Sequence, residues 1–499
     1  MDKDLQNQAS RCAGDVAVGA CLSEFPHDKL ADLKQTVYVI SDLHLGGEAA
    51  NDQSPGFQIC GEASQKLLVD FLEWVATQRR ADHDIHLVVN GDSVDFLAEK
   101  PFAAFTVDEN EAERKLEAIF DRTRAVWDGF QNVAGSGAQV TFTLGNHDLE
   151  LTLPGPRRLL RDTLGPGRVD FLFDNEALRI GSVLIEHGNR YDGWNAVNHD
   201  SLRRVRSALS RGEKPENFPA PPGSRLVVEV MNDLKRKYRF IDLLKPEQES
   251  VVPLLVALEP ATLAKIARVR QYRKQALAVR YADDGRPEDS EMIAARRATV
   301  TREKQSEDKA ASIALAAGVD LDQIGMGAVA AGLLDRWRAA TDGDKRQAEV
   351  RLAYEALQQW LGPHFTAFDT QLEDETYLLP ARTSLRNGFD TVIYGHTHLV
   401  KRLSPLGAND LYLNTGTWAE LMAVPRAILL DNEDDAKRQL EEFLDDLAAN
   451  KLDKWKRLLP TFAKIEMDGT KTVTRDVYLY QGRGEYNSLT NGRLVPSDS

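Results

Sequence analysis

Residues 36–200 carry two alternating hydrophobic periods, one typical of strands and one typical of helices. Short apolar runs rich in β-branched residues predict strands at 36–43, 85–92, 138–146 and 182–189. Between them, apolar residues at helical spacing predict helices at 64–78 and 110–133. Strands and helices that alternate in this way are typical of an α/β fold with largely buried strands.

After residue 200 the pattern changes to long helical stretches rich in Ala, Arg, Lys and Glu, as at 260–282 and 345–361, with proline-rich breaks between them. Strand patterns resume at 389–398 and 410–418, and two further strands are predicted at 461–468 and 474–481. We therefore interpret the middle of the chain as an inserted helical cap domain. The predicted division is an N-terminal extension 1–35, a first core part 36–200, the cap 201–385, a second core part 386–487 with a helical insertion at about 432–459, and a C-terminal tail 488–499.

Composition narrows the class of protein. The 499 residues have a formal net charge of −15, which argues against a general nucleic-acid coat. Residues 201–280 are locally basic, with 17 Lys and Arg against 8 Asp and Glu. Solvated helix faces are the ordinary interpretation, and a surface for an anionic ligand or membrane is the alternative.

The cysteines and the apolar segments bear on location. The three cysteines, Cys12, Cys21 and Cys60, show no metal-binding C-x-x-C spacing and cannot all pair with one another, which fits a reducing compartment. The chain shows no signal-peptide pattern and no run of about 18 apolar residues, so the sequence favours a cytoplasmic protein without a transmembrane segment.

Each of five predicted strands has residues that can bind metal at its carboxyl end or just after it. The five sets hold half of the ten histidines and are Asp42 with His44, Asp92 with Asp95, Asn146 with His147 and Asp148, His187 alone, and His396 with His398. Ligands of open α/β sheets bind beyond the carboxyl ends of the strands, so we expect these side chains to meet at one edge.

The residue types indicate the chemistry of such a site. Imidazole and carboxylate ligands without thiolate suit Zn, Mn or Fe ions. The nitrogen and oxygen donors are too many for one ion and suit two. Two ions about 3.5–4 Å apart are the usual arrangement for displacement at phosphorus.

The blocks "DLH", "GDSVD", "GNHD", "HG" and "GHTH", in this order, resemble the calcineurin-like metallophosphoesterase family over residues 36–200 and 386–420. The resemblance implies a four-layer α/β/β/α sandwich, which is the fold we predict, with the large helical insertion added. It also implies roles for the residues of the blocks. One ion would be bound by Asp42, His44 and His398, the other by Asn146, His187 and His396, and both by Asp92.

The resemblance gives the remaining residues of the blocks other tasks. His147 would contact the phosphate and assist the leaving group, and Asp148 would orient His147. Asn146 would also face the substrate. We expect Asp95 to fix its loop by hydrogen bonds to backbone. Arg190, three positions after His187, can hold a phosphate oxygen or form a surface ion pair.

The function that the resemblance implies is hydrolysis of a phosphate ester by attack of a hydroxide that bridges two divalent ions. Mn²⁺ is the first expectation, with Zn²⁺, Fe or Ni²⁺ as alternatives. A monoester, a diester or a pyrophosphate is possible as substrate, nucleotide- or lipid-linked among others, and the oligomeric state stays open. A bacterial branch that includes UDP-2,3-diacylglucosamine pyrophosphatases is distantly similar, but it usually has Arg at the position of His147. The alternatives are a metal-dependent nuclease and a non-catalytic binding platform, and nucleic acid is not the favoured partner.

Overall fold

The computed structural model describes residues 34–48, 56, 58–258, 367–430 and 432–489, together with positions 346–347, 350–351, 353–355, 357–358 and 361. Several predicted segments lie outside the described residues. They are nearly all of the N-terminal extension, the predicted helix 260–282, and all but the first two residues of the C-terminal tail.

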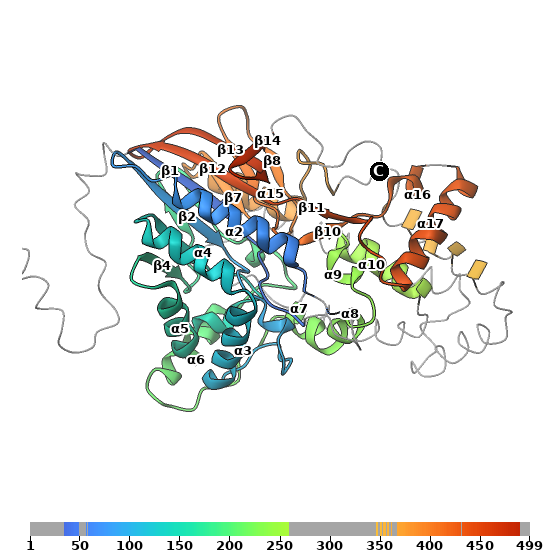
Figure 1. Cartoon of the computed structure of the whole chain (residues 1–499), viewed down its shortest axis with the longest axis horizontal. Coiled ribbons are helices and arrows are strands. Elements are labelled where there is room, and N and C mark those ends of the chain that lie inside the picture. The colour runs from blue at the N-terminus through green and yellow to red at the C-terminus, as the bar shows by residue number, and fades with distance from the viewer. Residues whose placement is uncertain are drawn as a thin grey trace, which may run out of the picture.

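The larger sheet has seven strands in the order β14-β13-β12-β1-β2-β3-β4 (Figure 1). β1 to β4 are mutually parallel, while β12, β13 and β14 extend the sheet with antiparallel pairs. The bounds are β1 Lys34–Ile40, β2 His83–Asn90, β3 Gln139–Thr143, β4 Arg168–Leu172, β12 Thr461–Asp468, β13 Lys471–Gly482 and β14 Glu485–Ser488.

The second sheet has five strands in the order β5-β6-β7-β9-β8. Its central strands β6, β7 and β9 are parallel, and the edge strands β5 and β8 pair antiparallel. The bounds are β5 Leu178–Ile180, β6 Val183–Ile185, β7 Thr391–Tyr394, β8 Lys401–Leu403 and β9 Leu411–Asn414. A separate ribbon joins β10 Glu420–Met422 to β11 Lys456–Leu458.

Alternate residues of β1 face two different cores, because successive side chains of a strand point to opposite faces. Tyr38 and Ile40 pack in the cluster that also holds the helices, whereas Val37 and Val39 pack against residues of the second sheet. Four helices contribute to the first of these clusters, namely α2 Glu62–Ala76, α3 Glu109–Arg122, α4 Arg124–Gly135 and α5 Pro154–Leu164. Figure 1 shows α2 and α4 lying across the first sheet.

The outer face of the second sheet packs against α15, Glu375–Arg386, through Leu378, Ala381 and Leu385. The mixed α/β class predicted from the sequence is confirmed. The three packing clusters are what an α/β/β/α order requires, and that four-layer order itself stays a prediction.

Two predicted helices differ in extent from what their apolar spacing suggests. The helix expected over 110–133 is divided at Thr123, whose hydroxyl donates to the Ile119 carbonyl and accepts from Trp127 Nε1. The helix expected within 432–459 is α17, Glu433–Ala448, and the chain then turns at Asn450, which has a φ of 52°. Asparagine tolerates this left-handed conformation, which commonly ends a helix.

The described helices of the middle segment do not all pack together. α6, His199–Leu209, joins the main core through Val205. The next helices share a hydrophobic cluster with α16 and α17 from the far end of the sequence, on the right of Figure 1. The helices concerned are α7 Pro222–Leu226, the π-helical turn η5 Val227–Met231, α8 Asn232–Lys235, α9 Phe240–Leu243, α10 Glu247–Leu258 and α16 Arg426–Leu430. The domain boundaries stay a prediction.

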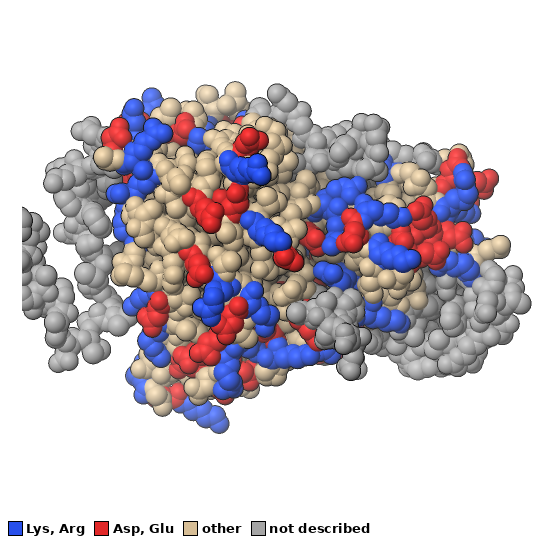
Figure 2. Space-filling model, in the orientation of Figure 1, with Lys and Arg blue, Asp and Glu red and all other residues tan. Residues whose placement is uncertain are grey.

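Basic side chains of the described middle segment are balanced by acids. Arg203 and Arg206 both contact Asp174, and Lys235 lies 2.6 Å from Asp242. On the face drawn in Figure 2, Lys and Arg are interspersed with Asp and Glu. Within the described ranges, no helix combines the length and the apolar character that crossing a bilayer would take.

Candidate metal centre

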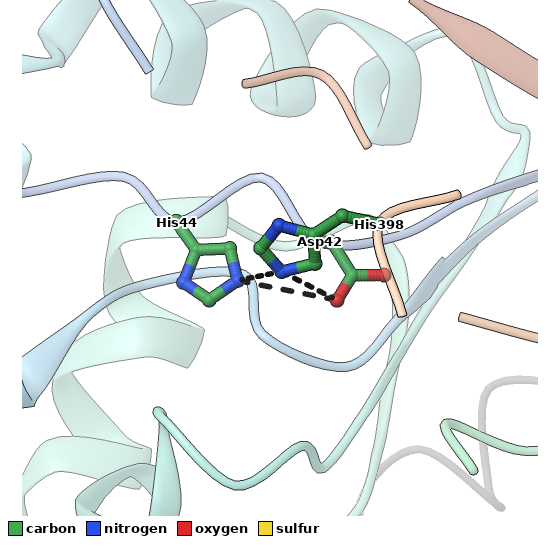
Figure 3. A group of neighbouring side chains, drawn as sticks. All are labelled: Asp42, His44 and His398. Atoms are coloured by element: carbon green, nitrogen blue, oxygen red, sulfur yellow. Dashed lines mark hydrogen bonds and ion pairs between the residues drawn. The ribbon is translucent and has the colours of Figure 1, made fainter. Parts of the chain in front are cut away.

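The first group of potential ligands follows β1 and β7. Its members are Asp42, His44 and His398, all buried or nearly so. Figure 3 shows the two imidazole rings turned toward the carboxylate. The Nε2 atoms of His44 and His398 are 3.0 Å apart and lie 3.9 and 3.5 Å from Asp42 Oδ1. Burial raises the pKa of Asp42, and the nearby charge of Asp92 acts in the same sense.

The second group follows β2, β6 and β7, and consists of Asp92, His187 and His396. His187 Nε2 lies 3.2 Å from Asp92 Oδ2, while His187 Nδ1 lies 2.8 Å from the Asn90 carbonyl oxygen. A carbonyl only accepts, so Nδ1 carries the hydrogen, and Nε2 is the ring nitrogen that faces the group. A backbone carbonyl on the far nitrogen is a common way to fix a metal-binding imidazole.

Asp92 lies between the two groups. Its Oδ2 atom is 3.7 Å from His44 Nε2 and 3.2 Å from His187 Nε2. Its Oδ1 atom accepts the backbone N–H of His147 at 2.8 Å. One carboxylate therefore reaches an imidazole of each group and also positions the "GNHD" loop.

Unpaired buried atoms test whether this site suits a cation. Asn146 Oδ1 is buried without a hydrogen-bond partner among the described residues, and His187 Nε2 is buried with the Asp92 carboxylate at 3.2 Å but without a hydrogen bond to it. Such atoms are costly to bury unless something satisfies them. An amide oxygen and an imidazole nitrogen are both ligands for divalent ions, so the residues present fit the metal that the sequence implies.

Backbone conformation marks the same residues. Five of the eight non-glycine residues with positive φ in the described part of the chain are predicted ligands, namely Asp42, His44, Asp92, His396 and His398. Non-glycine residues rarely adopt this conformation, and such strain clusters at functional sites. This backbone conformation directs the side chains at the strand ends toward one another.

The glycines that precede the ligands allow the loops to approach closely. A Cβ atom on Gly145 would lie 2.0 Å from Asp92 Oδ1, and one on Gly395 would lie 2.6 Å from Asp42 Oδ2. Any larger residue at these positions would displace a carboxylate. Each loop therefore needs its glycine because a ligand from another strand occupies the space.

His147 lies beside both groups, and its side chain is 20% exposed, more than that of any of the four predicted histidine ligands. Its Nδ1 atom is 3.0 Å from Asp95 Oδ1. Burial alone would lower the pKa of His147, but Asp95 and Asp92 outweigh it and raise that pKa to about 9. A protonated, partly exposed imidazole is suited to donate a proton to a substrate.

Asp148 does not orient His147, which corrects our expectation from the sequence. Its two carboxylate oxygens accept the backbone N–H groups of Gly145 and Ser93 at 2.8 and 2.9 Å. Asp148 is fully buried and ties two of the loops together. Asp95 takes the place beside the imidazole, and it also accepts from the backbone of Leu97 and Ala98, as expected for a loop-fixing residue.

Arg190 is close in sequence to His187, but its described contacts lead elsewhere. Its guanidinium lies 3.8 Å from Glu186 Oε2 and near the ring of Tyr191. The phosphate-binding role of Arg190 stays a prediction. Two residues that the sequence did not single out, Asp192 and Asn195, contact the ligands His396 and Asn146.

Histidines outside the motifs have contacts away from the site. His83 pairs with Thr36 at 2.7 Å, and His86 pairs with Thr141 at 2.8 Å. His27 and His364 lie outside the described residues. Trp418 is fully buried and donates to the Thr461 carbonyl, so it belongs to the core.

An α/β fold with carboxylate, amide and imidazole side chains gathered on the loops after its strands is typical of a metal-dependent hydrolase. Residues 35–232 match the family model for calcineurin-like phosphoesterase. Over these residues the chain is similar to calcineurin-like phosphoesterases, and this family indicates a metal-dependent phosphoesterase that acts on a phosphate-ester substrate. No curated protein matches the chain. The matched segment ends before β7, so His396 and His398 lie outside it. The fold brings these two histidines beside the candidate ligands that lie within the segment.

Proposed function

We propose that the chain hydrolyses phosphate esters with two divalent ions held side by side, one by each group of ligands. The observation that supports this most directly is the position of Asp92 Oδ2, 3.7 Å from His44 Nε2 and 3.2 Å from His187 Nε2. A carboxylate that reaches both groups is the bridge that a two-metal centre needs. Asp42 and His398 complete one site, and Asn146 and His396 the other.

When bound, two such ions supply the positive charge that activates a water and neutralises the phosphoryl oxygens. The chain's own part is to hold its ligands rigidly. Asp42 accepts the backbone N–H of His396 at 3.1 and 2.9 Å, which joins the strand ends of the two sheets. The backbone N–H of His44 donates to the Asp92 carbonyl at 2.9 Å.

We assign the proton for the leaving oxygen to His147. Asp95 accepts at Nδ1 and favours the protonated ring, so that Nε2 can donate to the substrate. Asp95 is held in turn by the N–H groups of Leu97 and Ala98 at 3.1 and 3.2 Å. The ring therefore has a fixed direction before any substrate binds.

Mn²⁺ is the ion we propose for the assay, with Zn²⁺, Fe and Ni²⁺ as alternatives. The predicted ligand set offers nitrogen and oxygen donors and no thiolate, which suits these ions. Burial raises the pKa of the Cys60 thiol to about 12, and Cys60 is in none of the ligand groups.

A metal titration of the full chain tests the proposal. The protein is stripped with a chelator and Mn²⁺ is added in known amounts, while hydrolysis is followed on aryl monoester, aryl diester, cyclic nucleotide, nucleotide-sugar and single-stranded nucleic acid. We expect no turnover without metal, and turnover that rises as the second equivalent binds. Full turnover with a single ion per chain would contradict the two-ion centre. Strong loss of nucleic-acid binding with salt would favour the nuclease alternative.

A further inference from the structure

Asp192 contacts a predicted ligand without being one. It ends the 3-10 turn η4, Asn189–Tyr191, and its Oδ2 atom lies 3.1 Å from His396 Nε2. A carboxylate accepts the hydrogen of this contact, so His396 Nε2 is the ring nitrogen that carries it. The lone pair of His396 Nδ1 is then available to an ion.

Asn195 extends this contact to a second ligand. Its Nδ2 donates to Asp192 Oδ2 at 2.7 Å, and its Oδ1 accepts from Asn146 Nδ2 at 3.4 Å. The amide of Asn146 is thereby turned with its nitrogen toward Asn195. The oxygen of that amide is the buried atom without a hydrogen-bond partner. Asp192 and Asn195 thus fix the direction of both His396 and Asn146.

The middle segment of the chain packs directly on Asn195. The backbone N–H of Gly223, in α7, donates to the Trp194 carbonyl at 2.8 Å. A Cβ atom on Gly223 would lie 2.4 Å from Asn195 Oδ1 and 3.0 Å from the Trp194 carbonyl. Helix α7 therefore packs against Asn195 Oδ1, the same oxygen that accepts from Asn146.

We propose that Asp192 and Asn195 are positioning residues that set the affinity of the second ion, and that α7 holds them in place through Gly223. This inference rests on the two-ion function proposed above. It gives part of the middle segment a role in metal binding that is separate from any contact with substrate. Side chains that hold metal ligands typically change metal affinity about 10- to 100-fold when they are removed.

The experiment counts Mn²⁺ bound to the metal-stripped full chain by calorimetry and by the spin resonance of free Mn²⁺. Asp192→Ala is expected to keep one ion at wild-type affinity and to bind the other about 10- to 100-fold more weakly. Asp192→Asn should lie between the wild type and Asp192→Ala. The reason is that Asp192 accepts from the Trp194 N–H through Oδ1 and from His396 and Asn195 through Oδ2. The asparagine side chain has one oxygen only, so it can replace only part of these contacts.

Asp108→Ala is the matched control. Asp108 caps α3 by accepting from the N–H groups of Asn110 and Glu111, and its described hydrogen bonds include none to the site. Its loss should lower the melting temperature while both ions bind as in the wild type. A folded Asp192→Ala protein with two wild-type affinities would overturn the inference. Equal weakening of both ions would also overturn it, because that result indicates a general structural role.

Gly223→Ala tests the contact with α7 independently. The φ of Gly223 is not in the left-handed region, so alanine is hindered only by the contact with Asn195 and Trp194. We expect weaker binding of the second ion alone. Gly135→Ala, where a Cβ would meet nothing within 4 Å, should change neither ion. If Gly223→Ala bound both ions as the wild type does, the proposed role of α7 in holding Asp192 and Asn195 would be wrong.

The two proposals fail in different ways. If the wild-type chain itself binds a single ion, the two-ion function is wrong. If the wild type binds two ions and the Asp192 and Gly223 variants match it, the two-ion function stands and the positioning role is wrong.

Discussion

Asp95 Oδ1 lies 3.0 Å from His147 Nδ1, and this contact fixes the direction of the imidazole that we propose as proton donor. The two residues come from loops after neighbouring parallel strands, β2 and β3. The backbone N–H of Phe96 also donates to the His147 carbonyl at 3.1 Å. The proposed proton donor is therefore held at its side chain and at its backbone by one loop.

The His147→Gln variant tests the role of the imidazole. We expect both ions to stay bound, because the proposed role of His147 is that of a donor to substrate and not of a ligand. Turnover of an alkyl phosphate should fall about 10²- to 10⁴-fold, since general acid help has this size. A nitrophenyl ester, whose leaving group needs little protonation, should lose less. Equal losses for the two leaving groups would leave His147 with electrostatic support only.

The Asp95→Asn variant tests whether the carboxylate acts through that imidazole. Asparagine keeps an oxygen that can accept from Leu97 and Ala98 but removes the charge beside His147. We expect a loss of turnover smaller than that of His147→Gln. The double variant should be no slower than His147→Gln alone, because residues that act as a unit are not additive. Multiplied losses in the double variant would show that Asp95 acts separately.

The Gly145→Ala variant tests the packing between loops. Its Cβ would lie 2.0 Å from Asp92 Oδ1 and 2.4 Å from the Asp92 backbone nitrogen, so the shared carboxylate must move. We expect weaker binding of both ions and a loss of turnover in a folded protein, measured by Mn²⁺ titration and circular dichroism. Gly135→Ala serves as the control here too. Retention of both ions at full affinity would show that the loop can shift without cost.

His86 should make stability depend on pH. Burial lowers the pKa of His86 to about 4, and the charge of Arg168 adds to this effect. Because the folded pKa lies below the unfolded value, the unfolded chain takes up the proton first. Stability is therefore lost as pH falls from about 6.5 to 4, by about 3 kcal/mol in total, and is unaffected above that window.

The comparison with His86→Gln isolates this contribution. Both proteins are unfolded in urea with chelator present, from pH 8 to pH 4. The stability of the wild type relative to the variant should decrease across the window and stay constant above it. A difference that does not change with pH would show that His86 titrates alike in the folded and unfolded chain.

Much of the fold could be read from the sequence where strands are apolar and continuous. Strand β12 was predicted at Thr461–Asp468, and the structure has the same bounds. The short strands β4, β5 and β14 were missed, because their residues are largely exposed or half-buried and give no clear alternation. The predicted single edge is also a simplification, since the ligands come from two sheets.

The motifs identified the candidate ligand residues, but they could not show which other residues hold those side chains in position. The contact of Asp192 with His396 spans 204 positions and depends on the tertiary fold. Asp95 and Asp148 are both acids next to motif residues, and only the loop geometry decides which of them meets His147. The positive φ of Asp42 and Asp92 is likewise a property of the folded loops.

The number of ions bound by the wild type and by Asp92→Asn tests the two-ion centre most directly. Asp92 Oδ2 reaches His44 and His187, one from each group, so a single neutral amide there should weaken both sites. We predict two Mn²⁺ ions per wild-type chain, and in Asp92→Asn a loss of affinity at both sites together with a loss of turnover. Two tightly bound ions and full turnover in Asp92→Asn would contradict the shared carboxylate and with it the proposed centre.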